Sequence, residues 1–245
     1  MLTQPPLHVA ARLVTQEFPD CLAAFLAGSV IREEHTPTSD LDMVIVTESD
    51  AAAPYRRSLF RGGWPVELFV NTPASLRRFL ASDCARRRPS MPQMCAEGLI
   101  VWQTDDWAER IKDEAVQLLT AGPPPLSEDE ALVARYHISD LLEDLRGSQR
   151  PEESIFIAPL LAEAAINFHL VSKGHWQGQG KWLHRALKKV DPLLADRLVE
   201  SLQRLYCDRL VLPLIQLVEE LLAPSGGPLF DGYYSQAPRD PALGE

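Results

Sequence analysis

Apolar residues follow two spacings in the first part of the chain. Leu7, Ala10 and Val14 recur at helical spacing, and the predicted helix ends before Pro19. Short apolar runs bounded by turn residues are typical of strands. Strands are predicted at 21–27, 41–46, 64–70 and 98–102, and further helices at 51–61, 74–82 and 91–96. This order predicts a small mixed β-sheet domain.

From residue 105 onward the pattern is helical. Trp107, Ile111 and Ala115 share one face of a predicted helix, and the Gly-Pro-Pro-Pro run that follows it is typical of an interdomain linker. Later helices are predicted at 127–146, 154–173, 192–207 and 208–222. The predicted fold class is therefore α+β. Its parts are a sheet domain over 1–121, an α-helical bundle domain over 126–223 and a loose C-terminal tail over 224–245.

Composition narrows the class of protein. The chain has 245 residues, of which 46% are hydrophobic, enough for two domains with their own cores. A net charge of -10 argues against general nucleic-acid binding, which needs a basic groove to neutralise phosphates. The four cysteines lack Cys-x-x-Cys spacing, so no zinc site or disulfide framework is indicated. Without a basic leader or a run of membrane-spanning length, we expect a cytoplasmic protein with no membrane partner.

Candidate chemistry is concentrated between the first two predicted strands. Asp40 and Asp42 are two residues apart, and residues at this spacing in a strand project from the same face. Two carboxylates held this close repel each other unless a cation lies between them. Hard oxygen ligands favour Mg²⁺ over zinc. The pair therefore predicts a magnesium site, although Asp-x-Asp also occurs in ordinary surface turns.

A phosphate-binding turn is predicted just before the aspartates. Gly28 permits a close backbone approach, and Ser29 is expected to begin a helix whose free N–H groups and hydroxyl hold a phosphate. Magnesium ions beside bound phosphates are the apparatus of phosphoryl or nucleotidyl transfer.

The order of these residues resembles the signature of the DNA polymerase beta-type nucleotidyltransferase superfamily. The matching pattern is Gly28-Ser29, ten intervening residues, and then Asp40-Leu41-Asp42 followed by Met-Val-Ile-Val. The chain resembles in particular bacterial aminoglycoside adenylyltransferase-like proteins with a helical C-terminal domain. Members of the superfamily carry a third carboxylate on a later strand, and Glu67 within an apolar run matches it. Because an unpaired buried glutamate is costly, we expect Glu67 to face the same cleft.

The resemblance implies roles for these residues. Asp40, Asp42 and Glu67 would be catalytic metal ligands, and Gly28 and Ser29 would bind the phosphates of a nucleotide. Aminoglycoside adenylyltransferases also bring a lysine from the helical domain to these phosphates.

Lys181, in a stretch rich in Gly and Trp, resembles that lysine, and the alternative is a surface lysine. Glu163 and Asn167 stand four residues apart on a predicted helix and would face either the acceptor or solvent. Glu33, Glu34 and His35 are predicted to be solvated, and metal coordination is the alternative for the two glutamates. The basic cluster 86–88 is also predicted to be solvated, with contact with a triphosphate as its alternative.

The sequence thus predicts an Mg²⁺-dependent nucleotidyltransferase. It would transfer AMP from ATP, or another nucleoside monophosphate from its triphosphate, to a hydroxyl of a small-molecule acceptor. An acidic chain suits a polycation such as an aminoglycoside. The alternative is an antitoxin-like or regulatory protein of the same fold that modifies or binds a protein partner, but the presence of all three carboxylates favours an enzyme. The sequence does not specify the acceptor, the nucleotide or the oligomeric state.

Overall fold

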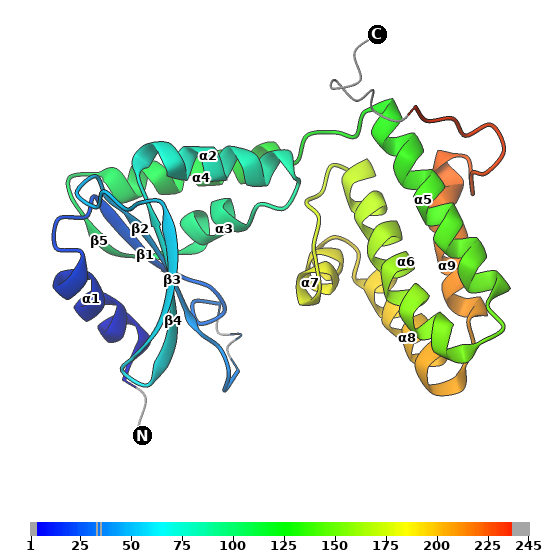
Figure 1. Ribbon diagram of the computed structural model, residues 1–245, viewed down its shortest axis with the longest axis horizontal. Coiled ribbons are helices and arrows are strands. Elements are labelled where there is room, and N and C mark those ends of the chain that lie inside the picture. The colour runs from blue at the N-terminus through cyan, green and yellow to red at the C-terminus, as the bar shows by residue number, and fades with distance from the viewer. Residues whose placement is uncertain (1–3, 33, 35, 237–245) are drawn as a thin grey trace, which may run out of the picture. The chain divides into compact units, whose positions relative to one another are not determined.

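The structure is a computed structural model that describes residues 4–32, 34 and 36–236. The chain divides into two compact units, Met1–Pro123 and Pro124–Glu245. The first unit contains a β-sheet with helices, and the second unit is helical in its described part (Figure 1). The fold class is α+β, as the sequence predicts.

The sheet of the first unit has five strands in the order β3-β4-β2-β1-β5. The strands are β1 (Ala23–Ala27), β2 (Leu41–Val46), β3 (Tyr55–Arg61), β4 (Trp64–Asn71) and β5 (Leu99–Gln103). β1 pairs antiparallel with β2 and β5, β2 runs parallel to β4, and β3 pairs antiparallel with β4. The parallel pairing of β2 with β4 places the beginnings of these two strands side by side.

Helices cover both faces of this sheet (Figure 1). They are α1 (Pro6–Glu17), α2 (Pro73–Ala85), α3 (Ser90–Glu97) and α4 (Trp107–Ala121). Successive residues of β2 pack on opposite sides: Met43 and Ile45 contact the core that includes α1, whereas Val44 and Val46 contact the core of α2, α3 and α4. Both faces are buried, so the central strands are continuously apolar.

β3 corrects the prediction of a helix at 51–61. Gly62 and Gly63 have φ of 58° and 87° and form the two-residue turn of a β-hairpin between β3 and β4. Tyr55 and Leu59 pack against the α1 side, while the residues between them are exposed. The helix prediction is wrong because the charged residues of this edge strand obscure its two-residue periodicity, although Gly-Gly is a hairpin signal.

The second unit is a bundle of helices α5 (Glu128–Gly147), α6 (Pro151–Ser172), α7 (Lys181–Val190), α8 (Pro192–Asp208) and α9 (Leu212–Leu222), followed by the short 3₁₀ helix η1 (Ala223–Ser225). Ser127 and Glu130 form the predicted capping box of α5, and the Asp191 side chain caps α8. The prediction omits α7, whose apolar residues nonetheless recur at helical spacing from Trp182 to Val190.

α6 is the central helix of the bundle and packs against α5, α7, α8 and α9. By length and composition it could cross a membrane, so the expectation that no segment reaches that length is wrong. Within this bundle, however, 56% of its most apolar window is buried. The mostly buried core helix of a soluble protein meets the same criteria of length and composition.

The segment after η1 lies against α5, whereas its composition predicts a loose tail. The Arg135 side chain donates hydrogen bonds to the carbonyls of Gly226 and Gly227, at 2.7 and 2.5 Å. The Tyr233 ring stacks on Tyr136, with 3.8 Å between ring centroids. These contacts make the described beginning of the tail part of the helical unit.

Candidate active site

Three carboxylates lie together where β2 and β4 begin. Asp42 on β2 is the register partner of Glu67 on β4, and Asp40 comes just before β2. One oxygen from each of the three side chains lies within 4.8 Å of the other two. The structure therefore brings together the three residues that the sequence predicts as metal ligands.

The cluster lies on the sheet face that α2, α3 and α4 cover, beyond the end of their core. Val44 and Val46 project on the same side as Asp42 and are fully buried in that core. The three carboxylates are only half-buried. The alternation along β2 thus places apolar side chains under the helices and carboxylates where a ligand can reach them.

The surroundings of Asp42 disfavour the charged form of its carboxylate. Burial, together with the nearby charges of Asp40 and Glu67, raises the pKa of Asp42 from 3.8 to about 6, although Arg56 and Arg32 act to lower it. A carboxylate in this environment is stabilised in its charged form by a bound cation. The oxygen-only set of ligands fits Mg²⁺ or a similar hard cation.

Gly28 lies directly against this carboxylate. Its φ is 85°, and a Cβ built at this position would lie 2.1 Å from Asp42 Oδ2. Real Cβ atoms essentially never make contacts this short, so any other residue at this position would have to displace the Asp42 carboxylate. The close backbone approach expected of Gly28 is therefore directed at Asp42, and its role toward a phosphate stays a prediction.

Ser29 connects the two halves of the motif. Its Oγ donates a hydrogen bond to Ser39 Oγ at 3.1 Å, and Ser39 Oγ accepts another from the backbone N–H of Thr36 at 2.9 Å. Turns follow Ser29 in the described part of this loop, so the predicted helix N-terminus is wrong there. The loop is polar and lacks the apolar periodicity that would hold a helix on the sheet. Glu33 and His35, predicted to be solvated, lie outside the described residues.

Sequence reasoning misses Arg56 because it places this residue in a helix. On β3, the Arg56 guanidinium pairs with the Glu67 carboxylate and lies 4.8 Å from the centroid of the Phe69 ring. The hairpin register determines both contacts, since Arg56 stands opposite Phe69. Arg56 is thus a cationic partner of Glu67.

The remaining predicted residues belong to the second unit. Lys181 is the first residue of α7 and is exposed, with its Nζ 5.9 Å from the centroid of the Trp182 ring. Its role toward nucleotide phosphates stays a prediction. Asn167 is buried and exchanges two hydrogen bonds of 3.0 Å with the backbone of Gly178. This contact gives Asn167 a structural role in place of the predicted solvent or acceptor contact.

Comparisons with known proteins add little to this geometry. No protein-family model matches the chain, and neither does any curated protein. Among solved structures, the chain is similar to the crystal structure of a nucleotidyltransferase-like protein from Exiguobacterium sibiricum 255-15 at 1.90 Å resolution. The TM-score is 0.48 at 11% identity, and the match covers 90% of this chain and 76% of that chain.

Proposed function

We propose that this protein is a nucleotidyltransferase that transfers a nucleoside monophosphate from a nucleoside triphosphate to a hydroxyl of a small-molecule acceptor. ATP is the first candidate for the triphosphate. The observation that carries the proposal is the cluster of Asp40, Asp42 and Glu67, whose oxygens lie within 4.8 Å of one another. Gly28 packed against Asp42 supports it, because the sequence motif and the carboxylates then form one local structure.

The residues of the cluster have distinct tasks in this proposal. Asp40 and Asp42 would hold Mg²⁺, and Glu67 would complete a second metal site. Bound Mg²⁺ neutralises charge on the triphosphate and stabilises the attacking and leaving oxygens of an in-line displacement. The Ser29 hydroxyl would turn from Ser39 Oγ to donate a hydrogen bond to the outer phosphates, to which nearby backbone N–H groups would also donate.

Glu67 acts as the base. It accepts the proton of the acceptor hydroxyl, whose oxygen forms a bond to the α-phosphorus while the bond between that phosphorus and the bridging oxygen breaks. Pyrophosphate leaves with the bridging oxygen. Because Arg56 pairs with Oε2 of the Glu67 carboxylate, the proton would go to the other oxygen, Oε1.

Calorimetry with each nucleoside triphosphate, with and without Mg²⁺, tests the proposal. We expect one triphosphate to bind the wild type in the presence of Mg²⁺ and to lose that binding in Asp40→Ala. Asp42→Asn should remove turnover while circular dichroism shows an intact fold. Full turnover in Asp42→Asn would refute the assignment. Absence of nucleotide binding to a folded wild type would instead favour a regulatory protein, to be pursued through a copurifying protein partner.

A further inference from the structure

A pocket of about 410 Å³ lies within the first unit, between β3, β4, α2 and α3. It borders the carboxylate cluster because Arg56, which pairs with Glu67, is also part of its wall. Phe69, another wall residue, follows Glu67 by two positions on β4 and so projects from the same face. Two residues of a strand span about 7 Å. A ligand that fills this pocket and extends by about 7 Å past Phe69 would therefore bring a hydroxyl to the Glu67 carboxylate.

Aromatic and thioether side chains form much of the wall. Phe69 comes from β4, Phe79 from α2, and Met91 and Met94 from α3. Flat apolar groups pack well on phenylalanine rings and on the polarizable sulfur of methionine. The volume also lies in the range that small-molecule sites occupy, on the order of 300–1,000 Å³.

The charges on the wall oppose a cationic ligand. Asp83 is the one carboxylate among the described residues that line the pocket, and it is only 5% exposed. Its two oxygens accept hydrogen bonds from the Arg86 guanidinium and, at 2.8 Å, from the backbone N–H of Met91. Arg56 and Arg86 are the cationic side chains of the wall, and each is paired with a carboxylate, Glu67 and Asp83 respectively. A polycation would therefore find no unengaged carboxylate among the described residues of this wall.

We propose that this pocket holds the acceptor, and that the acceptor is a hydroxylated aromatic small molecule that is neutral or anionic. This inference rests on the proposed function, in which Glu67 takes the hydroxyl proton. It replaces the polycationic acceptor that the net charge of -10 favours. Net charge is summed over the whole chain, whereas recognition depends on the few charges that line the site.

Methionine methyl groups offer a direct test, because the chain has only four methionines. Met91 and Met94 line the pocket, while Met43 is fully buried against the α1 side of the sheet. Protein labelled with [methyl-¹³C]methionine would be titrated with 4-hydroxybenzoate, 2-naphthol and kanamycin, with Met91→Leu and Met94→Leu for assignment. We expect the two hydroxyaromatic probes, and not kanamycin, to shift Met91 and Met94 without moving Met43.

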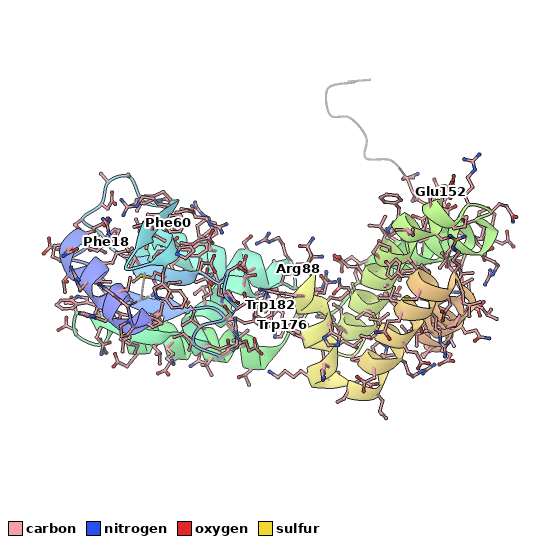
Figure 2. All side chains as sticks on the ribbon, turned by 90° about the horizontal axis from the view of Figure 1, so that it is seen from below. Phe18, Phe60, Arg88, Glu152, Trp176 and Trp182 are labelled. Carbon is pink, nitrogen blue, oxygen red and sulfur yellow. The ribbon has the colours of Figure 1, made fainter. Side chains whose placement is uncertain are left out.

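Two phenylalanine variants locate the binding site. Phe79 lines the pocket and is 39% exposed, so Phe79→Ala should fold and weaken binding of the aromatic probes about tenfold. Phe60 on β3, labelled in Figure 2, is 77% exposed and does not belong to the residues that line the pocket, so Phe60→Ala should leave binding unchanged.

The outcomes separate this inference from the proposed function. Shifts caused by kanamycin alone, or no shift of Met91 and Met94 with either aromatic probe, would overturn the acceptor class. Nucleotide binding measured by calorimetry on the same protein decides the transferase independently. Nucleotide binding without methyl shifts would overturn only the pocket assignment. Methyl shifts without nucleotide binding would overturn the transferase and, with it, the acceptor role.

Discussion

At the scale of single residues, Gly28 and Asp42 impose the tightest constraint on the site. Gly28 combines a positive φ with a position where a Cβ would occupy the space of the Asp42 carboxylate. Asp42 in turn holds a charge that burial and two neighbouring carboxylates disfavour. The site therefore favours a bound cation, and the protein without a cation is less stable for it.

Gly28→Ala should disable the metal site. The left-handed backbone costs an alanine about 1–2 kcal/mol, and the new Cβ would displace the Asp42 carboxylate. We expect the affinity for Mn²⁺, used as a spectroscopic probe, to fall at least about tenfold. Gly147→Ala is the matched control, since a Cβ at the end of α5 has nothing within 4 Å, and it should bind Mn²⁺ like the wild type. Equal affinity in both variants would contradict the contact with Asp42.

Asp42→Asn should stabilise the protein when no metal is present. Because the pKa of Asp42 is raised in the folded state, folding favours the protonated form, and the free energy of unfolding falls as pH rises from about 4 to about 6. A shift from 3.8 to about 6 corresponds to about 3 kcal/mol, lost in full above the folded-state pKa. In EDTA, urea unfolding should show Asp42→Asn as more stable by up to about 3 kcal/mol at pH 8 and equal to the wild type near pH 3.5.

Exposed Glu48 supplies the control for this measurement. Glu48→Gln removes a carboxylate outside the cluster and should change the free energy of unfolding by no more than about 0.5 kcal/mol. A destabilised Asp42→Asn at pH 8 would show that the carboxylate is satisfied without a cation.

Single residues of the site differ in how readily sequence reveals them. Asp40 and Asp42 follow from their spacing, and Glu67 from being a charged residue inside an apolar strand. Arg56 does not follow from a local pattern, because its two partners are selected by the pairing of β3 with β4. A residue whose role depends on strand register becomes visible only once the hairpin has been recognised.

At the scale of elements, the link between α6 and α7 has a packing role, although its Gly- and Trp-rich composition suggests a ligand-binding segment. Gly178 accepts and donates hydrogen bonds with the buried Asn167 side chain. A Cβ at Gly178 would lie 2.5 Å from the carbonyl oxygen of Trp182, in the first turn of α7. This glycine therefore allows the chain to pass close to a helix, and the same stretch led sequence reasoning to omit α7.

Asn167→Ala should destabilise the second unit. The substitution leaves the N–H and C=O of Gly178 without their partner in a buried position, at a cost of about 2–4 kcal/mol. Urea unfolding followed by helical circular dichroism measures this loss. Gln149→Ala is the control, because that exposed amide makes one long hydrogen bond of 3.4 Å to Gly147, and it should be nearly neutral. Equal effects of the two variants would contradict the role assigned to Asn167.

At the scale of the whole molecule, the core residues divide as the chain does. Among the residues that the structure describes, those of the two cores beside the sheet come from the first unit, and those of the helical-bundle core come from the second. Sequence periodicity predicts this division because strands and long amphipathic helices occupy different parts of the chain.

Separate cores predict two unfolding transitions in scanning calorimetry. For a unit of this size, 1 kcal/mol shifts the midpoint by about 4 °C. In EDTA at pH 8, Asp42→Asn should raise one transition by up to about 12 °C, because it removes the unfavourable charge in the first unit. Asn167→Ala should lower the other by about 8 °C or more, since its hydrogen bonds lie within the second unit. One transition that moves with either variant would show instead that the two cores unfold as a single cooperative structure.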